Sequence, residues 1–434
     1  MREIIVTKYG GTSITSAQDI EQVKRITEDD PQRRVVVVSA PGKRHDNDVK
    51  VTDMLIHLAE VRNKNSIPTI IERYKLLAPE RKMNDLKKDL EERYMLDAPK
   101  EAYLDALKAF GEEACAKIIA EKLKACYLDP KELFLVSNNF GNAKILPESE
   151  QLIKAAIDGK KIVVVPGFYG YTKEGQKATF SRGGSDLTGA YLAAALDAIV
   201  YENFTDRVGI LAADPTLVEN PKKIDELTFK EIRDLAYSGF TIFHHEAMGP
   251  LEKKLIPIHV RKTESYPGVG TYVVHDRISD AQKPVVGVAY QNGFCSFNID
   301  RFGLNEEEGI VQNLLAIFAD EKVPLSFFSN AIDDITVIVR EESVTKKVGR
   351  ISTRLYAATE ATIKFQEHLG CLVVAGKGLK GRRGISAEIQ NTLALAGVNI
   401  TFISQGSQER CIVYGIDRRD GKKAVTAVYD KYIR

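Results

Sequence analysis

Thr7-Lys8-Tyr9-Gly10-Gly11-Thr12-Ser13-Ile14 is a glycine-containing turn between an apolar run and the start of a helix. Residues 4–6 before it predict a buried strand, and Ser16-Ala17-Gln18-Asp19 after it is typical of a helix N-terminus. Glycines let a ligand approach the backbone, the first N–H groups of a helix favour an anion, and a lysine adds positive charge. The stretch therefore predicts either an anion site or an ordinary strand–helix turn with a surface lysine.

Short apolar runs alternate with helical periodicity from residue 1 to about residue 263. The four valines at 35–38 have no polar alternation, so both faces of this strand are expected to be buried, as in a parallel sheet covered by helices on both sides. Strands are expected at residues 4–6, 35–38, 133–136, 162–165, 198–201 and 256–260. Ligands of such sheets collect at the carboxyl ends of the strands, where Lys8, Gly10, Gly11 and Ser39 stand.

Two further stretches carry candidate chemistry. Residues 54–127 are mainly helical, and Gly111 in an apolar helix stripe lets another backbone come close. Glu112 beside it would be an ordinary solvated glutamate on spacing alone. Residues 181–186, Ser-Arg-Gly-Gly-Ser-Asp, form a second glycine turn at a helix start, where Arg182 could take a carboxylate with its planar fork and Ser185 or Asp186 would cap the helix.

Composition excludes several classes of protein. The chain has 434 residues with 61 Lys+Arg and 60 Asp+Glu, so no basic excess points to nucleic acid. Its 5 cysteines are scattered without a C-x-x-C pair, which favours a reducing compartment, and its 7 histidines form no metal-binding pattern, so no protein-held metal is predicted. No apolar run is long enough to cross a bilayer, and the first residues read as a strand. We expect a cytoplasmic protein without nucleic-acid or membrane partners.

An internal repeat occupies the C-terminal part of the chain. Residues 309–329 align without gaps on residues 384–404, an offset of 75 residues, with matches such as Gly309/Gly384, Phe327/Phe402 and Ser329/Ser404. Each copy reads as strand, helix, strand, strand, helix and strand, which predicts a small sheet with helices on one face.

Together these stretches resemble the aspartokinases of the amino acid kinase family over essentially the whole chain. The family opening Lys-Phe-Gly-Gly-Thr-Ser corresponds to residues 8–13, Arg-Gly-Gly-Ser-Asp to residues 182–186, Gly-Glu to 111–112 and Thr-Asp to 205–206. The repeats resemble ACT domains, and Asn-Ile at 399–400 and Gln-Gly-Ser at 405–407 match the second one. The resemblance implies an α/β fold: an αβα sandwich with a mainly parallel sheet (the amino acid kinase fold), plus two ferredoxin-like βαββαβ ACT modules.

The resemblance also implies an activity. The γ-phosphoryl group of ATP, bound with Mg²⁺, would pass to the β-carboxylate of L-aspartate, the first step of lysine, threonine and methionine biosynthesis. A carboxylate with a pKa of about 4 is already ionised and needs no general base. The protein must instead neutralise charge and align two anions.

Site residues follow from the resemblance, position by position. The implied catalytic residues are Lys8, which supplies charge at the transferring group, and Asp186, which organises either Lys8 or the metal ion. The implied aspartate-binding residues are Ser39, Thr52, Glu112, Arg182, Gly183, Gly184 and Ser185, with Arg182 on the α-carboxylate and Glu112 on the ammonium. The implied ATP-binding residues are Lys8, Gly10, Gly11, Ser13, Thr205, Asp206, Leu211, Thr241 and Ile242, with Gly10 and Gly11 offering backbone donors.

Some positions depart from the family, and two other functions stay open. The family often has tyrosine at Leu211, arginine at Thr216 and lysine at Thr241, so nucleotide contacts should differ here. One other function is a family kinase acting on glutamate, acetylglutamate or UMP, against which the ACT-like modules and Glu112 count. The other is an amino-acid sensor without turnover, against which Lys8, Arg182 and Asp186 count.

Regulation and domain organisation are expected from the repeat. The modules should bind an end-product amino acid, lysine or threonine, through Ser329, Asp333, Asn399, Ile400 and Gln405, and should pair two chains as a homodimer. The expected domains are a catalytic domain at 1–282 with a helical insert at about 54–127, a first ACT-like module at 283–368 and a second at 369–434. A strand at 285–290 can pair with the second module.

Overall fold

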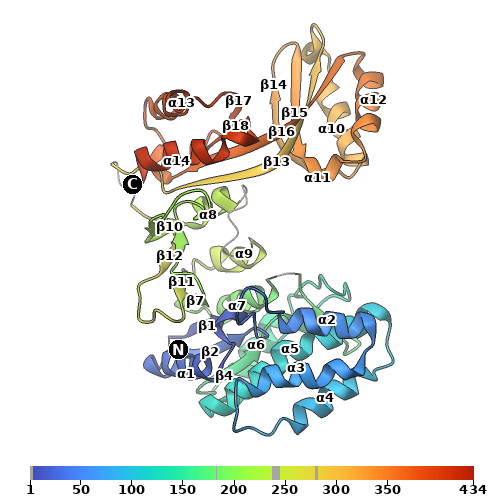
Figure 1. The fold of residues 1–434 in the computed structure, drawn as a ribbon, viewed down its shortest axis with the longest axis vertical. Helices are drawn as coiled ribbons and strands as arrows, with labels where there is room; N and C mark the ends of the chain where they lie inside the picture. The colour runs from blue at the N-terminus through green and yellow to red at the C-terminus, as the bar shows by residue number, and fades with distance from the viewer. Residues whose placement is uncertain (1–2, 182, 237–244, 279–281) are drawn as a thin grey trace. The chain divides into compact units, whose positions relative to one another are not determined.

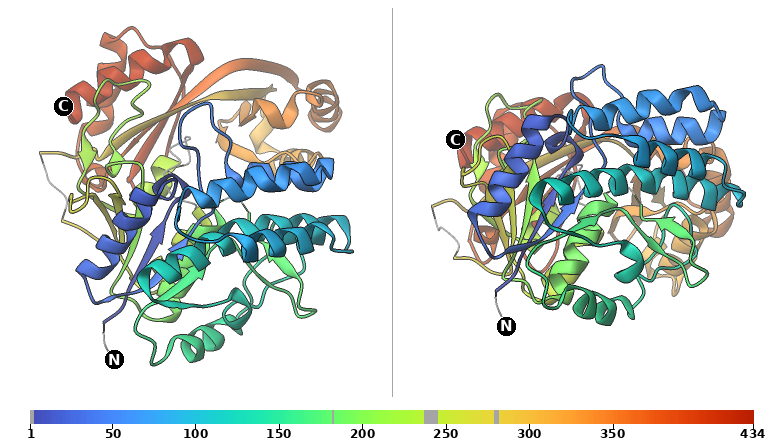
Figure 2. Two further views of the ribbon diagram at one scale, coloured as in Figure 1. Left: turned by 60° about the horizontal axis from the view of Figure 1, so that its bottom comes forward. Right: turned by 90° about the horizontal axis from the view of Figure 1, so that it is seen from below.

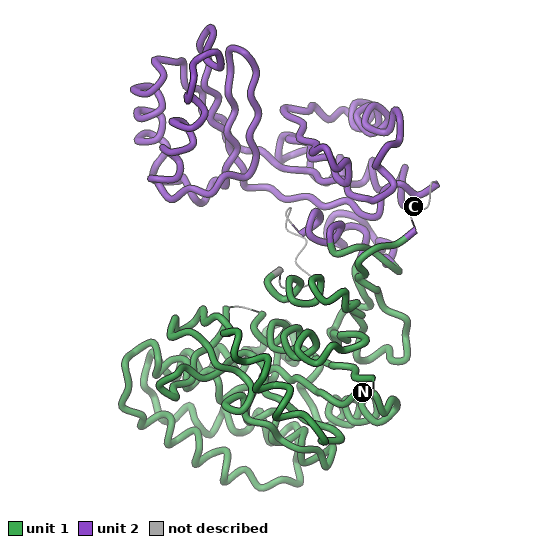
Figure 3. Tube along the Cα trace, turned by 180° about the vertical axis from the view of Figure 1, so that it is seen from behind, with its two compact units in different colours: residues 1–210, 225–229, 241–277 green, residues 211–224, 230–240, 278–434 purple. Residues whose placement is uncertain are grey.

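The computed structural model describes residues 3–181, 183–236, 245–278 and 282–434. The chain forms two compact units (Figure 3). Unit 1 contains residues 1–210, 225–229 and 241–277, and unit 2 contains residues 211–224, 230–240 and 278–434. The chain therefore leaves unit 1 for unit 2 three times. Residues 211–224 and 230–236, which fall inside the range expected for the catalytic domain, belong to unit 2, and the limits of that domain stay a prediction.

An eight-stranded sheet forms the centre of unit 1, in the order β10-β12-β11-β7-β1-β2-β4-β3 (Figure 1). The strands are β1 (Ile5–Tyr9), β2 (Arg33–Val38), β3 (Cys126–Tyr127), β4 (Val163–Pro166), β7 (Val200–Thr205), β10 (Glu226–Thr228), β11 (Ile258–Lys262) and β12 (Thr271–Val274). The strands from β11 to β3 run parallel, and only β12 is antiparallel to its neighbour β11. Val35, Val36, Val37 and Val38 are fully buried, so the mainly parallel sheet predicted from unbroken apolar runs is confirmed.

One predicted strand is wrong. Residues 133–136 contribute only isolated bridges, Leu135 with Tyr171 and Val136 with Ile145. This run is apolar because it lies under a separate hairpin, β5 (Tyr169–Tyr171) and β6 (Lys177–Thr179), whose Gly170 leaves no room for a Cβ beside Val136. Its burial comes from the hairpin and not from the central sheet.

Helices cover both faces of this sheet (Figure 2), as predicted for an αβα sandwich. One face packs against α1 (Ala17–Asp29), α2 (Val51–Val61), α3 (Ile67–Lys75), α4 (Asn84–Tyr94) and α5 (Lys100–Leu123). The other face packs against α7 (Gly184–Ala195), which α6 (Ser149–Ile157) and α9 (His245–Lys253) contact. The helix start predicted at Ser16 is confirmed, because Ser16 and Asp19 form a capping box.

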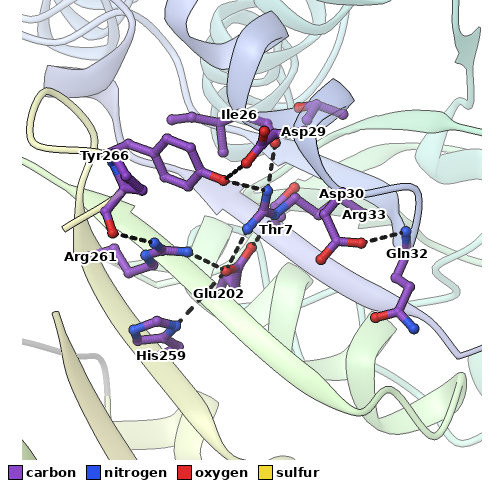
Figure 4. A network of polar contacts seen from close by, with 12 residues as sticks. Thr7, Ile26, Asp29, Asp30, Gln32, Arg33, Glu202, His259, Arg261 and Tyr266 are labelled. Carbon is purple, nitrogen blue, oxygen red and sulfur yellow. Dashed lines mark hydrogen bonds and ion pairs between the residues drawn. The ribbon is translucent and has the colours of Figure 1, made fainter. Parts of the chain in front are cut away.

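A buried ionic network lies on the α1 face of the sheet (Figure 4). Glu202 of β7 accepts hydrogen bonds from Arg33 of β2, at 2.6 and 3.1 Å, and from Arg261 of β11 at 2.9 Å. Arg33 also donates to the carbonyl oxygen of Ile26 in α1 at 2.7 Å. Because successive strand residues face opposite sides, Asn203 points to the α7 face. The network thus links β2, β7, β11 and α1 on one face of the sheet. Asn203 belongs to the other face, which α7 covers.

Unit 2 is built around a six-stranded antiparallel sheet in the order β14-β15-β13-β16-β18-β17. Its strands are β13 (Gly287–Asp300), β14 (Leu325–Asn330), β15 (Asp334–Arg340), β16 (Thr362–Ala375), β17 (Ile400–Gln405) and β18 (Cys411–Asp417). Its C-terminal helices are α10 (Ile310–Asp320), α11 (Glu341–Val344), α12 (Val348–Thr359), α13 (Ile385–Leu395) and α14 (Gly421–Tyr432).

The sheet of unit 2 has an internal twofold relation that follows the repeat. Gly287 pairs with Ala375. Their counterparts in the other copy, 75 positions away in the sequence, are Thr362 and Asp300, and these two residues pair as well. The equivalent rings of Phe327 and Phe402 also contact each other, with centroids 5.6 Å apart. Each copy therefore completes its sheet with a strand from the other copy, and β14 and β17 are the two outer strands.

Segments from the middle of the chain complete unit 2. They include the second residue of β8 (Ile210–Leu211), all of β9 (Lys223–Ile224) and all but the first residue of α8 (Phe229–Ala236). The backbone N–H of Val288 donates to Ala212 at 2.8 Å, and that of Lys222 donates to the Tyr429 hydroxyl at 2.7 Å. Among the described residues, no helix is both long and apolar enough to cross a membrane.

Candidate active site

Lys8 and Asp186 form a largely buried ion pair at the carboxyl end of the parallel sheet. Lys8 stands near the end of β1, and its Nζ lies 2.7 Å from Oδ1 of Asp186 in the first turn of α7. Asn203 of β7 donates to the same oxygen at 3.1 Å. The side chains of Lys8 and Asp186 are only 10% and 15% exposed. A carboxylate in the first helical turn is favoured by the helix dipole, so α7 holds a fixed acceptor for the ammonium group.

The glycine turn after β1 packs against the turn after β2. A Cβ on Gly11 would lie 2.6 Å from the carbonyl oxygen of Ala40, and Gly42 donates its N–H to Gly11 at 2.8 Å. The N–H of Gly10 donates to Phe204 at 3.0 Å, so the backbone donor expected from Gly10 is already engaged. Ser39 is half-buried and donates its N–H to Tyr9 at 3.2 Å. Only backbone fits between these two turns, which explains the glycines.

Glu112 on α5 is a buried carboxylate against the same turn. It is 4% exposed, and its Oε2 has no hydrogen-bond partner among the described residues. Burial raises the pKa of Glu112 to about 8, although a hydrogen bond from the Ala40 N–H and the charge of Lys108 lower it in part. A Cβ on Gly111 would lie 2.8 Å from the Cβ of Ala40, so the predicted close approach at this glycine is confirmed. The helix therefore places at the Ala40 turn an acid without a cationic partner among the described residues.

The adjacent Glu113, unlike Glu112, is surrounded by cationic side chains. It accepts bonds from Arg93 at 2.7 Å, Lys117 at 2.9 Å, Lys177 at 2.5 Å and Tyr169 at 3.1 Å. Burial alone would raise the pKa of Glu113, but the three cations hold it well below its usual range. Glu113 thus fixes the β5–β6 hairpin to α5 and has no free capacity for a ligand.

The second glycine turn leads into α7. Gly183 has a left-handed φ of 83° and is the N-cap of the helix, and no side chain caps it. The predicted cap at Ser185 or Asp186 is therefore wrong, because both residues already lie inside the first turn. Gly184 fits closely between Phe168 and Phe180, and Ser185 is buried close to Gly167. Arg182 lies outside the described residues.

The remaining predicted ATP-binding residues occupy different parts of the chain. Thr205 and Asp206 end β7 and, with Ser13, line a pocket whose other walls are Thr12, Gln18, Asp19, Gln22, Thr263 and Glu264. Ser13 Oγ lies 2.6 Å from Thr263 Oγ1 across this pocket. Leu211 belongs to unit 2, and Thr241 and Ile242 lie outside the described residues.

Thr52 and the predicted effector residues complete the set. Thr52 is half-buried in the first turn of α2. Ser329 lies on β14, and Asp333 follows that strand and accepts the Gly303 N–H at 2.6 Å. Asn399 precedes β17, which begins at Ile400 and ends at Gln405. The predicted effector residues thus lie on the two outer strands of the six-stranded sheet or directly beside them.

Sequence reasoning missed Asn203, Asp105 and Lys108. Asn203 holds Asp186, and a signal was available, because Glu202-Asn203 interrupts the apolar run of a central strand. Asp105 and Lys108 form a buried pair on α5 with an Nζ–Oδ1 distance of 2.6 Å. Their burial depends on contacts distant in sequence, so spacing alone gave no signal for them.

Comparisons with known proteins agree with this geometry. The profile of the amino acid kinase family matches residues 3–262, and that of an ACT domain matches residues 372–432. Aspartokinase 3 of Bacillus subtilis is 38% identical, with 98% of each chain covered.

Solved structures give the same result. The aspartate kinase of Clostridium acetobutylicum superposes with a TM-score of 0.88 at 29% identity, covering 99% of this chain and 100% of that one. Escherichia coli aspartokinase III, at 22% identity and a TM-score of 0.78, has the same fold, covering 100% of both chains. The chain therefore belongs to the amino acid kinase family and, within it, to the aspartokinases.

Proposed function

We propose that the protein transfers the γ-phosphoryl group of ATP to the β-carboxylate of L-aspartate, giving 4-phospho-L-aspartate and ADP. The observation that carries this proposal is the Lys8–Asp186 pair at the carboxyl end of the parallel sheet, where ligands of such sheets bind. Family membership supports the same reaction, and the structure of E. coli aspartokinase III contains aspartate and ADP. The product would enter lysine, threonine and methionine biosynthesis.

The reaction requires the protein to neutralise the charge of the phosphoryl group and to align the two anionic substrates. The acceptor carboxylate is ionised at neutral pH, so no general base is needed. Lys8 would stabilise negative charge on the moving phosphoryl group. Because Asp186 and Asn203 hold its position before substrates arrive, Lys8 needs little rearrangement during the reaction.

Aspartate would bind opposite this lysine. Glu112 offers a buried oxygen without a partner among the described residues, and a substrate ammonium group would supply the missing charge. Arg182 would hold the α-carboxylate. Thr52 and Ser185 would hold the β-carboxylate. The remaining aspartate-binding residues proposed are Ser39, Gly183 and Gly184.

ATP would bind with Mg²⁺ along the glycine turn and the end of β7. The nucleotide contacts proposed are Gly10, Gly11, Ser13, Thr205, Asp206, Leu211, Thr241 and Ile242. No three acidic, histidine or cysteine side chains form a metal cluster in the described part of the chain, which suits a Mg²⁺ held mainly by phosphate oxygens. Asp186 and Asp206 are the carboxylates that would contribute, and the ion would offset phosphate charge when bound.

A coupled ADP-release assay tests this function. We expect turnover with L-aspartate and much less with glutamate, acetylglutamate or UMP. Lys8→Ala should reduce kcat by at least about a hundredfold, because it removes a charge that stabilises the transition state. Lys24→Ala on α1, a half-buried lysine that pairs only with Glu28 of the same helix among the described residues, is the matched control and should keep normal activity. Preference for another acceptor would overturn the assignment, and aspartate binding without turnover in the unmodified protein would favour an amino-acid sensor.

Regulation, assembly, localisation and domain limits are also proposed. A structure of E. coli aspartokinase III contains lysine as well as aspartate, which supports lysine, or else threonine, as an effector of the C-terminal modules here. We propose binding at Ser329, Asp333, Asn399, Ile400 and Gln405, a homodimer formed through the modules, and a cytoplasmic location. The limits 1–282, 283–368 and 369–434 stay predictions. Light scattering with and without lysine or threonine tests assembly, and a monomer at micromolar concentration would contradict the dimer.

A further inference from the structure

One face of α5 carries a lysine between two buried carboxylates. Asp105, Lys108 and Glu112 are spaced by three and four residues, so neighbouring members lie within reach of each other on the helix. They are 1%, 8% and 4% exposed. Lys108 could therefore pair with either acid. Its Nζ lies 2.6 Å from Asp105 Oδ1, while Glu112 Oε2 has no partner among the described residues.

Three other hydrogen-bond donors explain why Lys108 pairs with Asp105 and not with Glu112. The backbone N–H groups of Thr179 and Gly141 donate to its Oδ2, each at 2.7 Å, and the Thr179 hydroxyl donates to its Oδ1 at 2.8 Å. These bonds hold the carboxylate in place beside Lys108. The ammonium group of Lys108 also lies 5.6 Å from the ring centre of Phe168, a favourable cation–π contact.

We propose that Asp105 is a positioning residue that holds Lys108 away from Glu112 and so keeps the Glu112 carboxylate open to the ammonium group of the amino-acid substrate. The inference rests on the proposed role of Glu112 in binding that ammonium group. Without the Asp105 charge, Lys108 turns to the only other acid within reach on α5 and competes with the substrate as an internal cation.

A pair of variants tests this inference through the Michaelis constants. Asp105→Asn should raise KM for aspartate about tenfold or more and leave KM for ATP within about twofold, because only the ammonium site is blocked. Adding Lys108→Met should bring KM for aspartate back towards the unmodified value, since the competing cation is gone. Lys108→Met alone should leave KM for aspartate within about twofold. A double variant as impaired as folded Asp105→Asn would overturn the proposal.

Thr179→Val separates this role from support of the β5–β6 hairpin. The variant removes the hydroxyl bond to Asp105 but leaves the Lys108 pair intact. We expect an unchanged KM for aspartate. A KM raised as far as in Asp105→Asn would show that the carboxylate acts through the hairpin, and would also overturn the proposal.

The unmodified protein gives a readout that does not depend on the Asp105 variant folding. If Glu112 is unpaired, KM for aspartate should fall as pH rises from 6 towards about 8, where the pKa of Glu112 lies. A flat profile between pH 6 and 9 would mean that Lys108 already neutralises Glu112 and would contradict the inference. Turnover of aspartate in the same assay shows whether the proposed function itself holds, so the two failures are distinguishable.

Discussion

At the scale of single residues, Glu112 and Glu113 show what a local pattern can and cannot predict. Lys8 and the glycines after it could be predicted, because a strand, a tight turn and a helix start are all encoded within a few residues. The state of Glu112 could not, because the Ala40 turn that covers it lies about seventy residues earlier. The pKa values of Glu112 and Glu113 thus shift in opposite directions because each carboxylate contacts different residues that are remote in sequence.

Glu112 should make stability depend on pH. Its folded pKa of about 8 is raised from the ordinary value, so the protonated folded form is favoured at low pH and this contribution is lost as pH rises through about 8. Glu112→Gln should therefore match the unmodified protein near pH 5 and exceed its stability near pH 9 by a few kcal/mol. Urea unfolding at both pH values measures this. Equal stabilities at pH 9 would show that the acid is not desolvated.

At the scale of elements, unbroken apolar runs predicted the parallel strands, and the same signal misassigned residues 133–136. Apolar character reports burial, and burial under a hairpin looks the same in sequence as burial in a sheet. The contact between the turns after β1 and β2 was also invisible, because two glycines that pack against each other leave no side-chain pattern.

Gly11→Ala tests how strictly these two turns must meet. The new Cβ would lie 2.6 Å from a carbonyl oxygen and 3.0 Å from the N–H nitrogen of Gly42, so the backbone must shift. We expect a loss of about 1–3 kcal/mol of stability and a marked rise in KM for ATP. Gly249→Ala in α9, where nothing lies within 4 Å, is the control and should be neutral or slightly stabilising. Unaffected ATP kinetics in Gly11→Ala would contradict a nucleotide role for this turn.

At the scale of the whole molecule, the repeat predicted two small sheets, and the structure joins their strands in one six-stranded sheet. Nothing in the sequence indicated that unit 2 also contains residues 211–224 and 230–236. Hydrophobic pattern reveals that a segment is buried and not which segment buries it. Leu235, for example, is fully buried and lies against Gly287, a residue beyond the next excursion of the chain into unit 1.

Truncation after Arg277 should therefore damage a region far from the cut. Ala212 would lose Val288, Lys222 would lose Tyr429, and the buried Glu231 would lose the N–H of Lys377. We expect residues 211–236 of the truncated protein to be cleaved rapidly in limited proteolysis, with cleavage sites read by mass spectrometry. The full-length chain provides the comparison and should resist there. Equal resistance would mean that these segments fold without the C-terminal region.

The palindromic register of the six-stranded sheet has a consequence for binding stoichiometry. The backbone is symmetric, yet the gap-free alignment of the repeat places Pro324 opposite Asn399, so only the second copy has an amide side chain at this position. Each copy has a carboxylate that fixes a neighbouring loop: Asp333 accepts the Gly303 N–H and Glu409 accepts the Gly381 N–H, each at 2.6 Å. Two sites that differ in this side chain should bind one ligand unequally, so an amino acid held through the Asn399 amide should saturate at one molecule per chain.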